Sequence, residues 1–488
     1  MAESQYIFSP REAHEAEQQW RVVKRSVDAR QRELRVHLTI LMDEQGQPIA
    51  KDAPIPLYAP PVFLDVHKAK RSVIIIGAGP AGLFAALTLL EHGIKPIIYE
   101  RGKEVSERKR DIALLNRNEG LNPESNYCFG EGGAGTFSDG KLFSRSKKRG
   151  NMQRVMELFH YFGAPDTVLY EAHAHIGSDK LPGIIKRMRE CILEKGGEIH
   201  FETKIDSLTP YTVHHTPIIL AIGHSAHDTY RMLAAESVAL ETKGFAMGVR
   251  AEHPQALINK LMYHSTNVDY VGNASYSLVT QVNGRGVYSF CMCPGGHIVP
   301  AGSEVGSCVV NGMSASHRNS PYANSGMVVQ INPEDIEGAD PLRGLEFQET
   351  LERLAFEHGG PQAQAPAQRM RDFVEGKASK DLPACSYLPG LVASRLDQWL
   401  PAHIGPRLQQ GFRDFDRKYP GFLTNEAVIV GVESRSSSAV RIVRDPETLQ
   451  SISTPLLYPC GEGAGYAGGI TSSALDGINA ALKIADLA

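Results

Sequence analysis

The pattern of hydrophobic and polar positions along residues 72–99 predicts a β-strand, a helix and a second strand. Residues 72–76 are almost all apolar and β-branched, which is typical of a strand buried in a parallel sheet. Apolar residues then recur at helical spacing over residues 83–90. Residues 96–99 form a second apolar strand, which ends at Glu100. This order is a complete βαβ unit.

The turn between the first strand and the helix predicts that this unit binds a dinucleotide. Gly77 allows the tight turn, Gly79 lets the backbone approach a pyrophosphate, and Gly82 lets the helix pack against the strand. The helix N-terminus directs free N–H groups at the phosphates. Glu100 is placed to accept hydrogen bonds from a ribose 2′-OH. The candidate contacts are Gly77, Ala78, Gly79, Pro80, Ala81, Gly82 and Glu100.

Residues before this unit show a different pattern and predict a small α+β unit. Ser9 and Glu12 have the spacing of a capping box, with proline at the first helical position between them. Residues 33–42 alternate between apolar and polar, which predicts a half-buried strand antiparallel to residues 21–27. We expect residues 1–68 to be a packing unit and linker without chemistry.

The remaining pattern predicts a parallel sheet interrupted by a long insertion. Helices are expected near residues 103–119 and 181–195, and strands at 198–203 and 217–222. Residues 225–427 differ, because short strand-like pieces are broken by Gly, Pro and Asn, which favours an inserted α+β domain with a mostly antiparallel sheet. Apolar strands and a closing helix then return. The predicted discontinuous nucleotide-binding domain comprises residues 69–224 and 428–488.

Two glycine-rich segments are predicted to meet the same ligand. Residues 126–141 contain five glycines and can approach a flat or phosphorylated ligand, although a flexible surface loop is the alternative. Residues 461–469 precede only one helix, so no second βαβ unit can form. Glu462 could accept from a ribityl or ribose hydroxyl, and the helix from Ile470 would place its positive end beside an electron-accepting ring. Contacts from such distant segments suit FAD better than NAD.

Composition and charge exclude several classes of protein. The 488 residues include 51 basic and 55 acidic ones, so nothing global favours nucleic acid or an anionic membrane as a partner. Six basic residues gather in residues 141–154, where a solvated loop edge is favoured over an anion-binding patch. We see no apolar signal segment and no membrane-spanning run. Seven cysteines without CxxC or HExxH motifs favour a reducing cytoplasm and no metal site.

Four residues are candidates for catalysis. Cys291 and Cys293 stand at the end of a predicted strand before Pro-Gly-Gly, and alternation would put both side chains on one face. A thiolate there could exchange electrons with a flavin or hold a substrate covalently, although cysteine often only packs. His224 could donate a proton or be a loop residue with a structural hydrogen bond. Arg435 is the remaining candidate.

Seven motifs together carry a family resemblance. They are GAGPAG followed by Glu100-Arg101, GEGGAGTFSDGK, AIGHSAHDT, FCMCPGG, NGMS, GVESRSSS and YPCGEGAGYAGGI, in this order. The chain resembles the largely uncharacterised bacterial FAD-dependent dehydrogenases, which are relatives of the two-dinucleotide-binding flavoprotein superfamily. The match covers most of residues 20–488.

The resemblance implies a fold and a set of cofactor contacts. The fold is a discontinuous, Rossmann-like, glutathione-reductase-like FAD domain of the α/β class, with the inserted α+β domain over the isoalloxazine. The ADP half is implied at the fingerprint residues, Glu100 and Arg101. Further implied contacts are Gly132, Gly133, Thr136, Lys141, Ile205, Gly223, Gly461, Glu462, Gly469 and Ile470.

Three functions are compatible with this pattern. The leading hypothesis is an FAD-dependent oxidoreductase, a dehydrogenase that moves a hydride or two electrons between the flavin and a small molecule. The alternatives are an FAD-dependent enzyme that modifies nucleic acid, which the charge balance disfavours, and a non-enzymatic flavin-binding regulatory protein. The inserted domain carries no recognisable code for a substrate.

Overall fold

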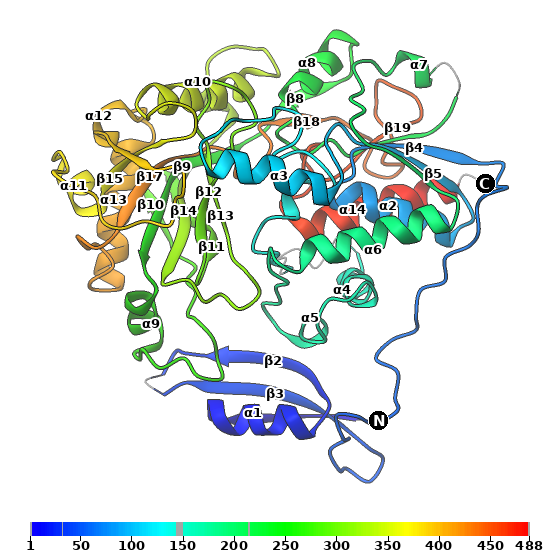
Figure 1. Ribbon diagram of the computed structural model, residues 1–488, viewed down its shortest axis with the longest axis horizontal. Coiled ribbons are helices and arrows are strands. Elements are labelled where there is room, and N and C mark those ends of the chain that lie inside the picture. The colour runs from blue at the N-terminus through cyan, green and yellow to red at the C-terminus, as the bar shows by residue number, and fades with distance from the viewer. Residues whose placement is uncertain (1, 32, 143–149, 213–214, 487–488) are drawn as a thin grey trace.

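The predicted strand–helix–strand unit is present as β4 (Ser72–Ile76), α2 (Pro80–Glu91) and β5 (Lys95–Tyr99). The computed structural model describes residues 2–31, 33–142, 150–212 and 215–486. Figure 1 shows three parts: a small N-terminal unit at the bottom, a parallel-sheet unit that contains α2 and β4, and an insert that contains β9 and β14.

The parallel-sheet unit has five strands in the order β19-β7-β4-β5-β6, all parallel. The other strands are β6 (Glu198–His200), β7 (Ile218–Leu220) and β19 (Leu457–Pro459). Side chains of β4 alternate between two hydrophobic clusters, with Val73 and Ile75 in one and Ile74 and Ile76 in the other. Both faces of the sheet are therefore covered, as its continuous apolar strands require.

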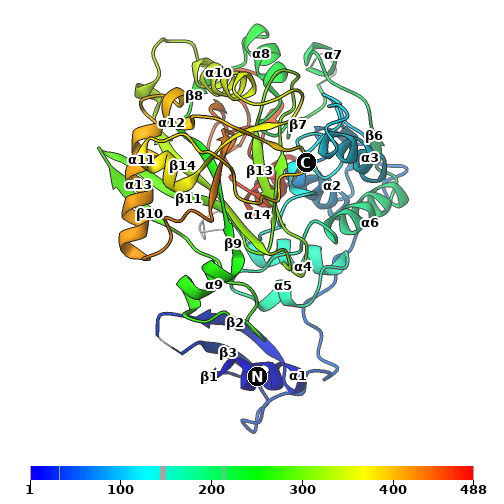
Figure 2. The ribbon, with the colours of Figure 1, turned by 60° about the vertical axis from the view of Figure 1, so that its left-hand side comes forward.

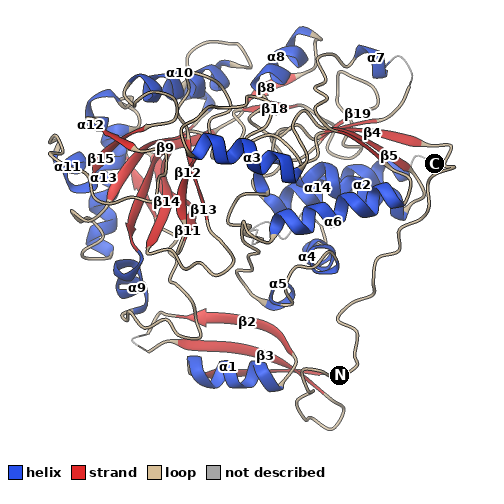
Figure 3. Ribbon diagram, viewed as in Figure 1, coloured by secondary structure: helices blue, strands red, loops and turns tan. Residues whose placement is uncertain are grey.

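Helices pack on this sheet from both ends of the sequence. The helix α14 (Ile470–Ala485) lies against α2, and both belong to the cluster that buries Ile75. Figure 3 shows α6 (Leu181–Glu194) beside them. The remaining helices of this unit are α3 (Val105–Asn116), α4 (Met152–Tyr161), α5 (Thr167–Tyr170), α7 (Thr209–Thr212), α8 (His227–Ala235) and the short 3-10 turn η1 (Gly133–Gly135).

The insert is built on a seven-stranded sheet in the order β10-β11-β14-β9-β17-β15-β16, antiparallel except for the last pair. Its strands are β9 (Phe245–Pro254), β10 (Val279–Val282), β11 (Arg285–Cys293), β14 (Tyr322–Ile331), β15 (Ala365–Arg369), β16 (Leu391–Ala393) and β17 (Val428–Glu433). Its helices are α9 (Gln255–Tyr263), α10 (Arg343–Glu357), α11 (Met370–Glu375), α12 (Leu396–Trp399), α13 (Gly405–Lys418) and the 3-10 turn η3 (Pro333–Asp335). The expected mostly antiparallel sheet is confirmed.

One strand lies in a different sheet from the one expected. The returning segment of the nucleotide-binding domain was predicted to begin at residue 428, but β17, which begins there, pairs with β9 and β15 in the middle of the insert sheet. All six residues of β17 are buried, so its apolar pattern does not distinguish one buried sheet from the other. The chain therefore leaves the insert sheet only after Glu433.

Two small two-stranded sheets complete the connection. The strands β12 (His297–Pro300) and β13 (Val310–Met313) form an antiparallel pair, and β8 (Leu240–Thr242) pairs with β18 (Val440–Ile442). The second pair joins the segment that enters the insert to the segment that leaves it.

The N-terminal unit is a three-stranded antiparallel sheet with one helix. Its elements are β1 (Ala2–Phe8), α1 (Pro10–Gln19), β2 (Val22–Asp28) and β3 (Arg35–Met42), and β3 is the central strand. The capping box at Ser9 and the pairing of β2 with β3 are confirmed. The strand β1 was not predicted. Figures 1 and 2 both place the unit below α5 and α9.

Arg25 joins the N-terminal unit to both larger parts. Its guanidinium donates to Glu171 at 2.9 Å and to the Tyr270 carbonyl oxygen at 2.8 Å. Glu17 accepts a hydrogen bond from the same side chain within the N-terminal unit.

Among the described residues, no helix is long and apolar enough to span a membrane. Residues 143–149 lie outside the described residues, so the interpretation of the basic stretch stays a prediction.

Candidate cofactor site

The turn after β4 has the close contacts that the glycine pattern predicts. Gly77 has a φ of 107°, and a Cβ there would lie 2.3 Å from the Ala221 carbonyl oxygen. A Cβ on Gly82 would lie 2.0 Å from the Gly77 carbonyl oxygen. Gly79 differs, because a Cβ there would meet only the Gly133 Cα, at 3.8 Å. Gly77 and Gly82 are therefore required by protein packing, whereas a side chain at Gly79 would meet only ordinary van der Waals contact with Gly133.

The Glu100 carboxylate organises the backbone around this turn. It accepts hydrogen bonds from the backbone N–H groups of Ala78 at 2.8 Å, Gly102 at 2.9 Å and Gly130 at 3.0 Å. Sequence reasoning assigned Glu100 to a ribose and did not foresee these three bonds. A carboxylate has about four acceptor positions, so one remains for a hydroxyl. Arg101 beside it pairs with Asp228 and lies over the Phe129 ring.

The first glycine-rich segment lies against the same turn, as predicted. The backbone N–H of Gly132 donates to the Ala78 carbonyl oxygen at 2.8 Å, and Gly133 contacts Gly79. Pro80, Gly132, Thr136 and Ile470 line one small, mostly apolar cavity. Four predicted contacts from three distant segments are thus brought together. Ile205 instead lies in the apolar cluster with Ile76 and Leu208.

The second glycine-rich segment closes the site from the C-terminal side. A Cβ on Gly461 would lie 2.9 Å from the Ala81 Cβ, and one on Gly463 would lie 2.5 Å from the Gly223 carbonyl oxygen. Burial raises the pKa of Glu462 to about 7, against the opposing charge of Lys243. His224 Nε2 lies 3.7 Å from the Glu462 carboxylate. Burial lowers the pKa of His224 to about 3, so this imidazole is neutral near pH 7.

Several glycines of these segments have open space beside their backbone. A Cβ built on Gly223, Gly468 or Gly469 would meet no heavy atom within 4 Å, and Gly79 is nearly as free. Gly469 is the N-cap of α14 and offers no capping side chain, so the first-turn N–H groups of this helix face that space. Lys141 Nζ is buried and makes no hydrogen bond, and it lies 3.9 Å from the Asp139 carboxylate. These donors and this free backbone suit an anionic cofactor that crosses the ends of the parallel strands.

The insert is fixed to this site by buried polar contacts that sequence reasoning missed. Arg318 pairs with Asp139 of the first glycine-rich segment at 2.6 Å, and the Asp139 side chain is 1% exposed. The Ser316 backbone N–H donates to Asp179, and Ser178 donates to the Ser314 carbonyl oxygen. The partners lie about 140 to 180 residues apart, so no local pattern could have revealed them.

The two cysteines lie together at the end of β11, but not through regular alternation. Cys291 has a φ of 47°, and the pairing with β14 shifts between Phe290 and Cys293, which marks a β-bulge. This bulge breaks the alternation on which the sequence argument relied. Cys291 is partly exposed and Cys293 is buried, and neither forms a disulfide.

Arg250 and Glu433 form a buried ion pair behind these thiols. The guanidinium is 0% exposed and the carboxylate 1% exposed, at 2.8 Å from each other. Arg250 also donates to the Cys291 carbonyl oxygen at 2.7 Å and to Cys293 Sγ at 3.5 Å. Burial raises the pKa of Glu433 to about 7, although Arg250 opposes the shift.

Arg435, the fourth catalytic candidate, is fully engaged with protein groups. It makes two hydrogen bonds to Glu352, at 2.9 and 2.8 Å, and one to Ser303 at 2.7 Å. Its Nη1 also lies 3.7 Å from Cys128 Sγ. This arrangement is that of a structural buried ion pair, so nothing in its contacts favours a role in turnover.

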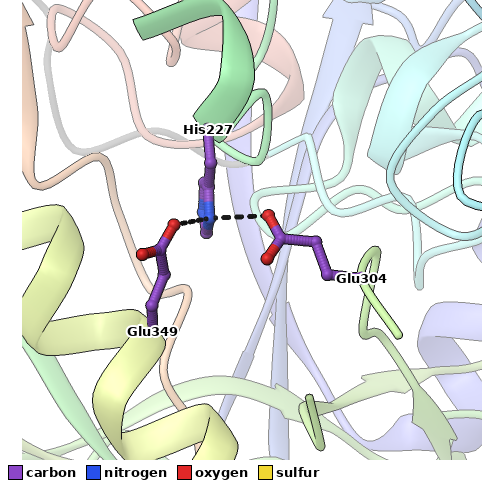
Figure 4. Close-up of side chains that lie close together, drawn as sticks. All are labelled: His227, Glu304 and Glu349. Atoms are coloured by element: carbon purple, nitrogen blue, oxygen red, sulfur yellow. Dashed lines mark hydrogen bonds and ion pairs between the residues drawn. The ribbon is translucent and has the colours of Figure 1, made fainter. Parts of the chain in front are cut away.

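His227 lies between two carboxylates where the parallel-sheet unit meets the insert (Figure 4). Its Nδ1 is 3.0 Å from Glu349 and 3.1 Å from Glu304. The three ligand atoms lie within 4.8 Å of one another, a spacing that a metal ion could use. Arg231 already contacts both oxygens of Glu349 at 2.6 Å and balances its charge. An ion pair of protonated His227 with these carboxylates therefore needs no metal.

This ion pair predicts a pH-dependent stability. Burial lowers the pKa of His227, but the hydrogen bonds to Glu304 and Glu349 outweigh burial and raise it above 6.5. The stabilisation is therefore present in full below pH 6.5 and is lost as pH rises through the higher folded-state value. We expect the melting temperature of the apoprotein to fall over that range, and His227→Asn to remove much of the fall. The exposed His67→Asn is the control, and an equal pH profile for both variants would contradict the assignment.

Comparison with known proteins identifies the class. Residues 70–125 match a family described as "FAD binding domain", and residues 244–436 match "FAD-dependent protein, C-terminal domain-like". With the Rossmann-like sheet and the glycine turn, these matches define an FAD-dependent protein, and FAD is its cofactor. An uncharacterized protein of Clostridium beijerinckii is 44% identical over 435 residues, which cover 86% of this chain and 81% of that one. The chain belongs to the same family of FAD-dependent proteins as this relative.

The similarity to solved structures is much weaker. CtdE in complex with FAD and a substrate is 10% identical, with a TM-score of 0.31 over 86% of this chain and 81% of that chain. The halogenase PltM is 12% identical, with a TM-score of 0.33 over 86% and 69% of the two chains. An oxidoreductase from Methanosarcina mazei is 11% identical, with a TM-score of 0.32 over 84% and 99%. We transfer no residue role and no activity from them.

Proposed function

We propose that this protein is an FAD-dependent oxidoreductase, a dehydrogenase that acts on a small molecule held between the insert and the flavin. The observation that carries the proposal is the open backbone beside Gly79, Gly223 and Gly469, in three distant segments that the fold brings to the ends of the parallel strands. Bound FAD would supply a reversible acceptor of a hydride or two electrons.

We also propose a cytoplasmic location, which the seven free cysteines support.

The residues of the chain would hold and orient the cofactor. The Gly79 backbone and the α2 N-terminus would face the pyrophosphate, and Glu100 would use its remaining acceptor position for the adenosine ribose. Glu462 would accept from a hydroxyl of the ribityl chain. The N-terminus of α14 would place its partial positive charge near the flavin ring, where it favours negative charge.

The first test is the identity of the flavin. We expect the purified protein to be yellow and to release FAD rather than FMN on denaturation, because the βαβ unit with Glu100 is specific for an adenosine half. Chromatography of the supernatant measures this directly. Release of FMN, or failure to bind any flavin after incubation with FAD, would overturn the assignment of the site.

Turnover separates an enzyme from a flavin-binding regulator. The holoprotein is mixed anaerobically with fractions of a deproteinised small-molecule extract, and the visible absorbance of the flavin is followed. We expect at least one fraction to bleach the bound flavin or, after photoreduction, to reoxidise it, while free FAD in the same fraction reacts far more slowly. If no fraction distinguishes bound from free FAD, the regulatory alternative is favoured.

A further inference from the structure

The thiols of Cys291 and Cys293 differ in their surroundings. Cys293 is buried, its Sγ–H donates to the Cys291 carbonyl oxygen at 3.4 Å, and its sulfur accepts from Arg250 at 3.5 Å. These contacts are those of a neutral thiol. Cys291 is partly exposed. The Cys293 sulfur therefore lies within hydrogen-bond distance of the Cys291 backbone, and Cys291 is the more accessible thiol of the two.

Charges around the pair favour a thiolate at Cys291. The neighbouring Cys293 side chain is the largest influence and lowers the pKa of Cys291, and the cations Lys141 and Arg250 lower it further against burial and Asp139. The carboxylates Glu433 and Glu462 also face this thiol. The neighbouring Cys291 side chain and burial raise the pKa of Cys293. Lys141 Nζ makes no hydrogen bond, and its nearest carboxylate, Asp139, lies 3.9 Å away and is also paired with Arg318.

The bulge makes a bond between the two sulfurs possible but strained. Residues two apart in a regular strand have Cα atoms about 6.5 Å apart, near the upper limit for a disulfide. The bulge sets three residue steps of β11, from Phe290 to Cys293, opposite two steps of β14, so this segment is contracted relative to a regular strand. A strained disulfide is easily reduced, which is a property of catalytic rather than structural disulfides.

We propose that Cys291 and Cys293 form a dithiol that exchanges with small disulfides, with Cys291 as the attacking and Cys293 as the resolving residue. The inference rests on the proposed function for its place beside the flavin, and deepens it by naming thiols and disulfides as a substrate class. Lys141 and Arg250 are positioning residues that stabilise the attacking thiolate.

The exchange has two balanced steps. Cys291 Sγ bonds to one sulfur of the disulfide, the external S–S bond breaks, and the leaving thiolate takes up a proton. Cys293 then loses its proton and attacks Cys291 Sγ, which releases the second external thiol and leaves the Cys291–Cys293 disulfide. The external disulfide is reduced to two thiols, and the protein dithiol is oxidised by two electrons. The reverse sequence oxidises two small thiols.

The test uses the holoprotein and hydroxyethyl disulfide under anaerobic conditions, followed by acid quenching, proteolysis and mass spectrometry. We expect the peptide that contains both cysteines to lose two hydrogens. Cys293→Ser is expected to keep a mixed disulfide on Cys291. Cys291→Ser is expected to react with the disulfide at least about tenfold more slowly than the unmutated protein. Lys141→Met should slow the first step. Cys191→Ser, on the partly exposed cysteine of α6, is the matched control and should react like the unmutated protein.

Contrary results are equally specific. The inference would be overturned if the disulfide reagent modified Cys128 or Cys191 while Cys291 and Cys293 stayed unmodified. It would also be overturned if a mixed disulfide on Cys291 persisted in the unmutated protein although Cys293 is present. If the serine variants do not fold, brief alkylation of the unmutated protein decides the question, because Cys291 must react before Cys191. Peptide masses test the dithiol inference, whereas flavin content tests the proposed function. A protein that lacks FAD but completes the dithiol cycle would refute the proposed function and leave the dithiol inference standing.

Discussion

Gly79→Val is expected to yield a folded protein that no longer retains FAD. A Cβ at Gly79 would contact only the Gly133 Cα at 3.8 Å, and Gly79 has a φ of −77°, so the folded apoprotein can accept a side chain there. The same side chain would fill the space assigned to the pyrophosphate. We expect FAD affinity to fall about tenfold or more, which corresponds to at least ~1.4 kcal/mol. Equilibrium titration of apoprotein with FAD measures this loss.

Gly82→Ala provides the contrasting variant three residues away. Its Cβ would lie 2.0 Å from the Gly77 carbonyl oxygen, so the strand and helix must move apart. We expect the melting temperature of the apoprotein to drop, at a cost of about 1–3 kcal/mol. Gly79→Val should leave that temperature nearly unchanged. If both variants destabilise the apoprotein equally, the space beside Gly79 is not a ligand site.

Arg250→Met is expected to destabilise the insert by about 3–5 kcal/mol near pH 8, because it leaves a buried carboxylate without its cation. Arg250 and Glu433 are almost completely buried, and Glu433 already has a pKa of about 7 with Arg250 present. Without Arg250 that pKa rises further. The charged carboxylate is then costly above neutral pH, whereas at pH 5 it is protonated and the loss shrinks. Denaturant titrations of the apoprotein at both pH values measure the difference.

The double variant Arg250→Met/Glu433→Gln tests the cause of this loss. It removes both charges, so it should be more stable than Arg250→Met alone at pH 8 and should lose the added pH dependence. An ion pair of similar geometry at the surface, Arg30 with Asp28, offers a control, and Arg30→Met should change stability little. If Arg250→Met and Arg30→Met lowered the free energy of unfolding equally, the burial of Arg250 would not be the cause of the loss.

The sequence predicts the parallel sheet because each of its features is local. The strand β4, the turn through Gly77 and the helix α2 are encoded within about twenty residues, and the structure confirms them. The strand β17 shows the limit of this reasoning. Its residues are as apolar as those of β4, and a buried strand carries no mark of the sheet that it joins. Only pairing with β9, far away in sequence, decides the matter.

The candidate site divides in the same way. The glycines are predictable because glycine has a defined conformational use, and the structure places Gly133 against Gly79 and leaves open space beside Gly79 and Gly469. The polar contacts are not predictable from the sequence, because pairs such as Asp139 with Arg318 join segments about 180 residues apart. Glu100 lies between these cases. Its position was predictable from the βαβ unit, but its three backbone hydrogen bonds depend on where the first glycine-rich segment folds.

The packing of α14 on α2 has a consequence for synthesis on the ribosome. The helix α2 is almost entirely buried, but its partner begins only at Ile470, roughly 380 residues later. At typical translation rates of about 5–20 residues per second, α14 is synthesised roughly 20–80 seconds after α2, and until then the surface of α2 that packs against α14 stays exposed. During that interval the nascent chain cannot complete the cofactor site and must be protected from aggregation by other means. Flavin binding would thus act as a late checkpoint, which only chains extended past α14 can pass.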